Sequence, residues 1–304
     1  MKVLVCDKLE SSAVEAMRAA GLTVDIKTGM TPEQLVETVP GYHAAIVRSA
    51  TKFRKPAIDA AKSMKLIVRG GVGLDNIDVE YAQSKGIAVR NTPAAATISV
   101  AELTLGYMFA LARKIPQMTA SMKAGQWEKK AFEGYELYGK TLGIIGIGRI
   151  GTALAERCKA LGMKVFAYDI REVPSTDCYT CCGIDECLAR ADFISLHIPL
   201  TPETKNIINA NTIAKMKDGV FIINCARGGT IDEAALLAAL ESGKVAGAAL
   251  DVFEEEPTKN FKLLAHPNVL ASPHVGAQTF EGQGRVGAEV ADIVIAFAKE
   301  NKLI

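Results

Sequence analysis

The sequence lacks an excess of either charge, a long hydrophobic run and any low-complexity segment. It has 35 Lys and Arg residues against 34 Asp and Glu residues, which leaves a net charge of +1. Proteins dedicated to binding nucleic acids or membrane surfaces need a basic excess, so this balance argues against both classes. No apolar run approaches the roughly 20 residues of a membrane-spanning helix. Asp7 interrupts the apolar residues at the N-terminus, which predicts a first strand there and not a signal peptide.

Cysteine is sparse, and its count of seven is odd. A chain of 304 residues buries enough core to fold without disulfides, so we predict reduced thiols and a cytoplasmic location. Four cysteines, Cys178, Cys181, Cys182 and Cys187, lie close together in the sequence. Zinc sites normally pair two C-x-x-C elements and only one is present, so we predict no metal site. A redox-sensitive thiol group and inert, half-buried thiols both remain open for this cluster.

The first 92 residues alternate short apolar runs with helix-like stretches. Hydrophobic residues make up 49% of the chain and charged residues 23%, which is a globular composition. The spacing of Ser12 and Glu15 predicts a capping box that opens a helix, and Gly21 ends that helix. This β-α-β rhythm predicts a parallel sheet with helices on both faces. We predict strands at residues 2–6, 43–48, 65–69 and 87–90.

A second β-α-β series begins at Thr141. It follows a helical stretch over residues 97–112 and a polar stretch over residues 114–140 that carries the only Trp. The restart of the rhythm predicts an α/β protein with two doubly wound parallel-sheet domains, joined near the long helix. We predict strands of the second series at residues 142–145, 164–168, 193–197, 220–224, 246–251 and 269–272.

A glycine-rich turn opens the second series. Gly146, Gly148 and Gly151 form a G-x-G-x-x-G pattern between a strand and a helix. The first glycine permits the tight turn, the second lets the backbone approach a pyrophosphate, and the third lets the helix pack on the strand. Asp169 ends the next strand, where a carboxylate accepts hydrogen bonds from the ribose hydroxyls of NAD and repels the 2′-phosphate of NADP. The pattern predicts NAD as the cofactor. Arg171 is placed to reduce the repulsion between Asp169 and the 2′-phosphate of NADP.

Polar residues follow three later strands, where ligands bind in open α/β sheets. Arg227 follows one strand, Asp251 and three glutamates follow another, and His274 follows a third. Hydride addition to a carbonyl develops an alkoxide that needs a proton, and His is well suited to supply it near neutral pH. A carboxylate bonded to that His fixes its tautomer, and an Arg binds a substrate carboxylate through two hydrogen bonds. Glu254, Glu255 and Glu256 are also compatible with a solvated loop.

These motifs give the sequence a family resemblance. The runs Asn-Cys-Ala-Arg-Gly-Gly at 224–229, Asp-Val-Phe-Glu-Glu-Glu-Pro at 251–257 and Ser-Pro-His-Val-Gly at 272–276 resemble the D-isomer-specific 2-hydroxyacid dehydrogenases. The resemblance spans essentially the whole chain. It includes the segments 47–52, 70–76, 91–93 and 100–103.

The resemblance implies roles for individual residues. The catalytic trio is Arg227, Glu256 and His274. Substrate contacts come from Arg48, Ser49, Val72 and Gly73 together with Arg227, and Arg48 is the candidate for a substrate phosphate. The implied cofactor contacts are Gly146, Gly148, Arg149, Ile150, Gly151, Asp169, Cys225, Asp251 and Gly276.

The resemblance also implies a domain plan. Residues 1–95 and 281–304 form a flavodoxin-like substrate-binding domain, and residues 96–280 form an inserted Rossmann NAD-binding domain. The long helix and the arm around Trp127 are expected to build a homodimer. The expected partners are a small-molecule substrate and a second copy of the chain, with neither nucleic acid nor membrane. Longer members carry C-terminal regulatory domains, whereas this chain stops at Ile304, so we expect no feedback inhibition by serine.

Within the family, the resemblance is greatest to the members that interconvert 3-phosphoglycerate and 3-phosphohydroxypyruvate, the first step of serine biosynthesis. One segment departs from their pattern: Ala94-Ala95-Ala96 precedes Thr97, where those members typically have Gly-Asn before the Thr. The alternative is therefore a reductase of hydroxypyruvate or glyoxylate. A more remote alternative is an NAD-sensing corepressor, because such proteins share the fold and the trio.

Overall fold

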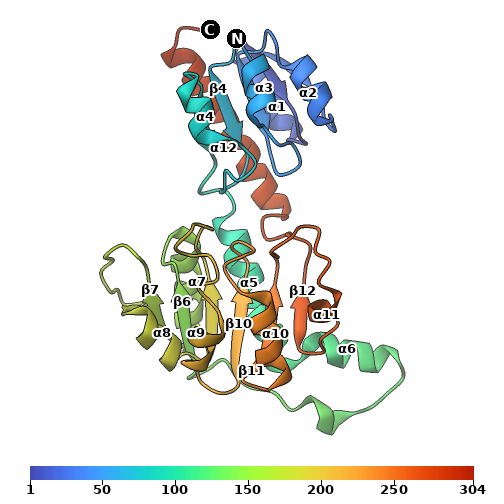
Figure 1. Cartoon of the computed structure of the whole chain (residues 1–304), viewed down its shortest axis with the longest axis vertical. Helices are drawn as coiled ribbons and strands as arrows, with labels where there is room; N and C mark the ends of the chain where they lie inside the picture. The colour runs from blue at the N-terminus through green and yellow to red at the C-terminus, as the bar shows by residue number, and fades with distance from the viewer. The chain divides into compact units, whose positions relative to one another are not determined.

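The computed structural model describes all 304 residues as two compact units. The first unit consists of Met1–Thr97 and Ala277–Ile304, and the second of Ile98–Gly276. Each unit has its own parallel sheet, seen as arrows in Figure 1. The chain thus belongs to the α/β class predicted from its rhythm.

The first unit is built on a five-stranded parallel sheet in the order β2-β1-β3-β4-β5, which is the flavodoxin-like order. Four of its strands fall where the apolar runs predicted them. β2 was not predicted, because only Val24 of its four residues is buried and the segment lacks an apolar run. The strands are β1 (Lys2–Val5), β2 (Thr23–Ile26), β3 (Ala44–Val47), β4 (Leu66–Arg69) and β5 (Ala88–Asn91).

Helices cover both faces of this sheet. Val3 and Val5 pack with α1 and α12 on one face, and Leu4 and Cys6 pack with α2, α3 and α4 on the other. This alternation is the period of two that a β-strand imposes on its side chains. The helices are α1 (Ser11–Ala19), α2 (Pro32–Thr38), α3 (Lys55–Ala60), α4 (Val79–Ser84) and α12 (Phe280–Glu300).

The capping box predicted for α1 is wrong. The helix begins at Ser11 with Glu10 as its N-cap, and no side chain bonds the free N–H groups there. A capping box is found instead at α2, where Thr31 and Gln34 bond each other's backbone N–H groups. The predicted end of α1 holds, because Gly21 lies just beyond the helix at φ 88°.

The second unit is built on a seven-stranded parallel sheet in the order β12-β11-β10-β9-β6-β7-β8. The strand order reverses between β6 and β9, so the carboxyl ends of these two strands form the switch point where ligands bind in such sheets. All strands except β8 were predicted. They are β6 (Thr141–Ile145), β7 (Lys164–Tyr168), β8 (Thr180–Cys181), β9 (Phe193–Leu196), β10 (Val220–Asn224), β11 (Val245–Leu250) and β12 (Val269–Ala271).

Helices also flank this second sheet. In Figure 1, α10 lies in front of the strands and α5 lies behind them. Leu111 of α5 comes within 3.2 Å of the Cβ position of Gly247 on β11, so the absent side chain lets the helix lie close to the sheet. The polar stretch after α5 contains a helix, α6, that was not predicted. The helices are α5 (Thr97–Arg113), α6 (Ile115–Lys123), η1 (Lys129–Phe132), α7 (Arg149–Ala160), α8 (Ile184–Arg190), α9 (Ala210–Ala214), α10 (Glu233–Glu241) and α11 (Phe261–Leu264).

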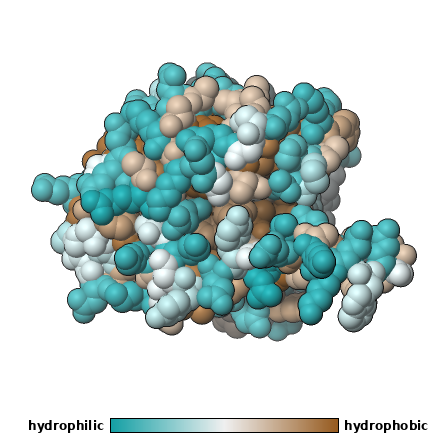
Figure 2. All heavy atoms as spheres, turned by 90° about the horizontal axis from the view of Figure 1, so that it is seen from below, coloured by the Kyte–Doolittle hydropathy of each residue, from teal (hydrophilic) through white to brown (hydrophobic).

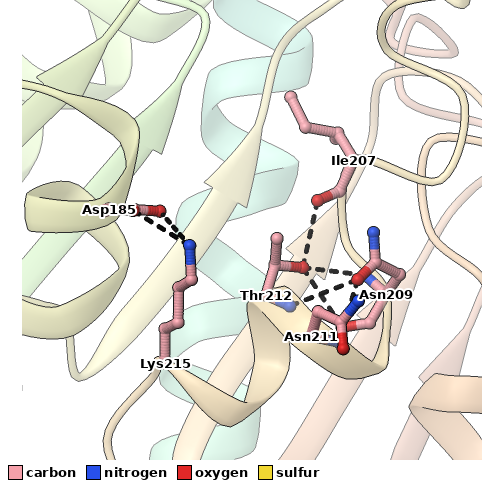
Figure 3. A network of polar contacts seen from close by, with 6 residues as sticks. All are labelled: Asp185, Ile207, Asn209, Asn211, Thr212 and Lys215. Carbon is pink, nitrogen blue, oxygen red and sulfur yellow. Dashed lines mark hydrogen bonds and ion pairs between the residues drawn. The ribbon is translucent and has the colours of Figure 1, made fainter.

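Local polar contacts fix the short helix α9 (Figure 3). The Asn209 side chain accepts hydrogen bonds from the N–H groups of Asn211 and Thr212, and the Thr212 hydroxyl accepts one from the Asn209 N–H. Lys215 closes the end of the helix with an ion pair of 2.8 Å to Asp185 of α8. These contacts join two neighbouring helices on one face of the sheet.

The surface is mixed in polarity. Figure 2 views the molecule from below and shows hydrophilic residues spread over this face with smaller hydrophobic areas between them. No helix combines the length and the apolar composition needed to cross a membrane.

Candidate active site

The three glycines of the turn after β6 play different geometric roles. Gly146 has φ 97°, and a Cβ there would lie 2.6 Å from the carbonyl oxygen of His197. A Cβ on Gly151 would lie 2.5 Å from the carbonyl oxygen of Gly146, so only glycine lets α7 start this close to the turn. A Cβ on Gly148 would meet no atom within 4 Å. The turn therefore leaves open space at Gly148, where a pyrophosphate must approach the backbone.

The start of α7 supplies the charge that suits this space. Gly148 is the N-cap of the 12-residue helix, and no side chain bonds its first N–H groups. Arg149 and Ile150 form the first helical turn. Free N–H groups and the positive end of the helix dipole favour a bound anion. The turn thus fits the diphosphate of a dinucleotide.

Asp169 lies next to this turn, directly after β7. Its carboxylate accepts a hydrogen bond of 3.1 Å from the Ile147 N–H. It also accepts bonds from the Arg171 backbone and guanidinium, at 3.0 to 3.2 Å. The hydrogen bond of the Arg171 side chain, stronger than the opposing effect of burial, lowers the pKa of Asp169. Asp169 is therefore an ionised carboxylate, and Arg171 is the neighbour that reduces its negative field.

His274 and Glu256 form a direct pair. The Nδ1 of His274 donates to Oε2 of Glu256 at 2.8 Å, and the two side chains are 43% and 39% exposed. Because a carboxylate only accepts, the proton of the neutral imidazole lies on Nδ1. Nε2 is then the nitrogen free to exchange a proton with a substrate.

Glu256 is held as a carboxylate by its neighbours. Burial raises its pKa, but the hydrogen bond and charge of His274, the Phe253 N–H and the charge of Arg227 outweigh burial and lower it. The Phe253 N–H donates to Oε1 at 3.2 Å, so both carboxylate oxygens are engaged. The loop of Arg227 touches this segment, because a Cβ on the neighbouring Gly228 would lie 1.6 Å from the Phe253 carbonyl oxygen.

The turn that carries Arg227 is fixed by buried polar groups after β10. Asn224 donates to the Arg227 carbonyl at 2.9 Å and accepts from the Ala226 N–H at 3.0 Å. The Thr230 hydroxyl donates to the same Arg227 carbonyl at 2.7 Å. Asn224 and Thr230 are almost fully buried. The backbone of Arg227 is therefore fixed, and its guanidinium donates to the neighbouring Ala226 carbonyl at 2.6 Å.

Asp251 fixes the loop that carries His274. It is 1% exposed, and its carboxylate accepts bonds of 2.8 Å from the N–H groups of Val275 and Gly276 and another bond from the Ser272 hydroxyl. His274 itself adopts φ 54°, a left-handed conformation that is unfavourable for residues other than glycine. The carboxylate of Asp251 therefore stabilises an unusual backbone at His274.

Cys225 also lies at the end of β10, but it is buried. Burial, the main cause, raises the pKa of its thiol to about 12. The thiol is therefore protonated at neutral pH. Cys225, which the family resemblance predicts as a cofactor contact, lies two residues before Arg227.

Apart from Arg227, the predicted substrate residues belong to the first unit. The Arg48 N–H donates to Asp7 at 2.5 Å, and its guanidinium donates to Gln283 of α12. Burial, the main cause, lowers the pKa of Arg48. The Val72 carbonyl accepts from Asn91 at 2.5 Å. Ser49 and Gly73 lie beside Arg48 and Val72 in these two loops.

Asp7 and Gln283 could not be identified from the sequence as partners of Arg48, because both are far from it along the chain. Asn224, Thr230 and Ser272 were missed for a different reason: their roles depend on hydrogen bonds that only the folded loops define. The sequence did give the positions of Asn224 and Ser272, which end predicted strands, whereas Thr230 lies six residues beyond one.

The cysteine cluster contains no metal-binding arrangement. No group of three or more His, Cys, Asp or Glu side chains in the 304 residues is placed to hold a metal ion. The Cys187 thiol donates to the carbonyl oxygens of Ile144 and Phe166, both at 3.8 Å. Burial, the main cause, raises the pKa of both Cys182 and Cys187. Burial, with a smaller effect from the charge of Asp169, also raises the pKa of Cys181. These three thiols are poor nucleophiles in this state.

The chain is similar in sequence to known proteins. Residues 105–276 match the family described as "D-isomer specific 2-hydroxyacid dehydrogenase, NAD binding domain". The chain is 51% identical over 296 residues to the D-3-phosphoglycerate dehydrogenase of Methanocaldococcus jannaschii, covering 96% of this chain and 56% of that protein. It is 49% identical over 295 residues to the hydroxypyruvate reductase of Thermotoga maritima, covering 96% of each protein.

A solved structure is also similar to this chain. The D-lactate dehydrogenase of Aquifex aeolicus, complexed with NAD and lactic acid, matches with a TM-score of 0.88 at 30% identity, covering 99% of this chain and 96% of that one. The chain spans 56% of the length of the Methanocaldococcus phosphoglycerate dehydrogenase and 58% of the length of the one from Archaeoglobus fulgidus. The second unit is an NAD-binding domain, which confirms the cofactor predicted from the glycine turn and Asp169.

Proposed function

The chain belongs to the D-isomer-specific 2-hydroxyacid dehydrogenase family, and we propose that it transfers hydride between NAD and D-3-phosphoglycerate, giving 3-phosphohydroxypyruvate. The observation that carries this proposal is the pair of His274 and Glu256, with the loop of Arg227 in contact with the loop of Glu256. The pair provides a proton donor and acceptor, and the Arg provides a cation for a carboxylate. Oxidising an alcohol that carries a carboxylate requires both.

NAD, when bound, accepts the hydride in oxidation and NADH supplies it in reduction. In oxidation, His274 takes the hydroxyl proton on Nε2, and in reduction it returns that proton to the developing alkoxide. Glu256 holds Nδ1 and stabilises the imidazolium that forms. Arg227 binds the substrate carboxylate and polarises the carbonyl beside it.

We assign the two units different roles. The first unit binds the substrate, through Arg48, Ser49 and the backbone of Val72 and Gly73. The second unit binds NAD, and Cys225, Asp251 and Gly276 contact it together with the glycine turn and Asp169. Arg48 is suited to the phosphate because Asp7 holds its backbone and Gln283 holds its guanidinium, and a guanidinium with restricted motion loses less entropy on binding.

A second candidate is a reductase of hydroxypyruvate or glyoxylate. The observation that favours it is the Thermotoga hydroxypyruvate reductase, which matches over 96% of both chains. In the first unit, Ala95 and Ala96 are buried small side chains in the segment where the phosphoglycerate enzymes typically have Gly-Asn. This segment lacks the amide that a phosphorylated substrate would otherwise contact.

The test is NADH consumption with 3-phosphohydroxypyruvate, hydroxypyruvate, glyoxylate and pyruvate at equal concentrations. We expect kcat/KM to be at least about tenfold higher for the phosphorylated acid, which corresponds to about 1.4 kcal/mol. An equal or higher kcat/KM with an unphosphorylated acid would still agree with hydride transfer by this family, but it would contradict the phosphorylated substrate. Arg48→Gln gives a matched variant, because it should reduce the preference for the phosphorylated acid with little effect on hydroxypyruvate.

We propose further that the protein is a cytoplasmic homodimer. All seven cysteines are free, which suits a reducing compartment. Trp127 is 82% exposed, and Met122 and Ile115 of α6 are also exposed. Exposed large apolar side chains gathered on one segment favour a protein contact.

A further inference from the structure

We propose that Glu233 is a positioning residue that acts through Glu256, by fixing the loop from which the catalytic carboxylate extends. This inference rests on the proposed function. Glu233 is the first residue of α10 and was not among the residues singled out from the sequence. It follows Arg227 by six positions and precedes Glu256 by 23.

Glu233 and Glu254 bond each other reciprocally. The Glu254 N–H donates to Oε1 of Glu233 at 2.8 Å, and the Glu233 N–H donates to Oε1 of Glu254 at 3.1 Å. Two residues of separate segments thus exchange side-chain-to-backbone bonds. Such a pair fixes both the distance and the orientation of the backbones that it joins.

Asn260 engages the other oxygen of Glu233. Its Nδ2 donates to Oε2 of Glu233 at 2.7 Å, and its Oδ1 accepts from the Leu263 N–H at 3.3 Å. Asn260 lies beyond Glu256 along the chain, whereas Glu254 lies before it. Glu233 therefore holds the loop on both sides of the catalytic acid.

This attachment reaches Glu256 within two residues. The Phe253 N–H donates to Oε1 of Glu256, and Glu254 is the next residue after Phe253. Any movement of Glu254 therefore displaces the Phe253 N–H, which is a hydrogen-bond donor to the Glu256 carboxylate. A misplacement of about 1 Å in a catalytic site costs up to about 100-fold in rate, so this loop has little freedom.

Burial distinguishes Glu233 from an ordinary helix-capping acid. An acidic residue in the first turn of a helix is favourable while fully exposed. Glu233 is only 8% exposed, and both of its oxygens accept bonds from the loop of Glu256. The desolvation of a carboxylate is compensated here by bonds that serve the catalytic loop.

The test begins with Glu233→Gln. The amide oxygen still accepts from the Glu254 N–H, but the amide nitrogen now faces the Asn260 nitrogen, so two donors oppose each other. We expect kcat/KM for the keto acid to fall about tenfold. A carboxylate near a general acid favours its protonated form, and here Glu256 does so for His274. Displacing Glu256 should therefore lower the pH above which the rate of reduction declines, as Glu256→Gln should also do. The dissociation constant of NADH should stay within about twofold, since the loop attachment does not involve the glycine turn or Asp169.

A reciprocal exchange provides the rescue. In Glu233→Gln combined with Asn260→Asp, the Gln amide nitrogen donates to the new carboxylate, and the other Asp oxygen still accepts from the Leu263 N–H. The negative charge is retained within the pair. We expect this double variant to recover kcat/KM and the pH profile to within about threefold of wild type.

Two further variants separate positioning from stability. Asn209→Ala removes the cap of α9 and should lower the melting temperature while leaving the pH profile unchanged. In a Glu256→Gln background, Glu233→Gln should have no further effect on the profile, because the two residues act in series.

The outcomes distinguish the two proposals. If the wild-type enzyme reduces none of the keto acids, the proposed function fails. If the wild-type enzyme is active but Glu233→Gln leaves kcat/KM and the pH profile unchanged, the proposed role of Glu233 is wrong. The same holds if the effect of Glu233→Gln adds fully to that of Glu256→Gln.

Discussion

Arg171 illustrates how one neighbour adjusts cofactor choice. Its guanidinium bonds the Asp169 carboxylate, and it is itself 69% exposed. The charge that repels a 2′-phosphate is therefore partly neutralised by a side chain on the surface. We therefore expect discrimination between NAD and NADP to depend on both residues and not on Asp169 alone.

We predict that Arg171→Ala strengthens the preference for NAD. Without the guanidinium, the Asp169 carboxylate repels the 2′-phosphate more strongly, and the ratio of kcat/KM for NADH over NADPH should rise roughly tenfold. The measurement is steady-state kinetics with both cofactors. A fall in that ratio would show that Arg171 does not lie where a 2′-phosphate binds.

The lowered pKa of Glu256 predicts the pH dependence of its contribution to stability. Because its pKa in the folded protein is below the ordinary value of 4.5, the carboxylate stabilises the fold above that value. The contribution is lost as the pH falls through the lower, folded-state value. The melting temperature of Glu256→Gln should therefore lie below that of wild type at pH 7, and the two should converge in acid. A difference that grows toward low pH would contradict the assignment.

The catalytic residues illustrate how far sequence reasoning reached. The chemistry of hydride transfer predicted an Arg, an acid and a His at strand ends, and the structure brings His274 and Glu256 into contact with Arg227 near them. The choice among Glu254, Glu255 and Glu256 came from the family resemblance, because three adjacent acids have the same chemistry. The partners Gln283 and Glu233 depend on tertiary contacts and left no local signal.

At the scale of elements, the site is a set of loops that follow neighbouring parallel strands. The loops after β10 and β11 touch directly: a Cβ on Gly228 would lie 1.6 Å from the Phe253 carbonyl oxygen. Gly228 follows Arg227, and Phe253 donates to Glu256. The close approach of two backbones therefore sets the spacing between Arg227 and Glu256, the two proposed catalytic residues of these loops.

Gly228→Ala tests this spacing. The methyl group has no space because its nearest atoms are backbone, so the two loops must separate. We expect kcat/KM to fall by about 100-fold or more, with a lower melting temperature. Gly183→Ala is the matched control, because a Cβ there meets no atom within 4 Å. Equal activity in the two variants would show that the contact does not define the site.

The elements themselves were largely predictable. Buried parallel strands give continuous apolar runs, and these located every strand except β2 and β8. β2 has one buried residue, and β8 has only two residues at the sheet edge, so neither has a clear pattern. The wrong cap at α1 has a similar cause, because Ser12 and Glu15 lie inside a helix that starts at Ser11.

At the scale of the whole molecule, two parallel-sheet units are combined in one chain. The first unit is interrupted after Thr97 and resumes at Ala277, so its sheet and α12 come from opposite ends of the sequence. Periodicity predicted two series of strands but did not show where α12 packs. The helix contacts α1 and β4 through its apolar face. An apolar face alone does not specify which of the two sheets a helix covers.

The homodimer proposal makes a prediction at this scale. Each chain has a mass of 32.4 kDa, and sedimentation of the wild type should give twice that value. Trp127→Ser should shift the protein toward the monomer at micromolar concentration, because Trp127 is a large apolar surface residue. Phe261→Ser is the control, since Phe261 is also largely exposed in the second unit but lies outside the arm. A wild-type mass of one chain would contradict the proposal.

The central claim is that this chain moves a proton through His274 while hydride moves between NAD and a 2-hydroxy acid. The most direct measurement is NADH oxidation by 3-phosphohydroxypyruvate in wild type and His274→Ala, with NADH binding followed by fluorescence. We predict that turnover falls by about 10²–10⁴-fold while the dissociation constant of NADH is unchanged. Undiminished turnover in His274→Ala would contradict the account.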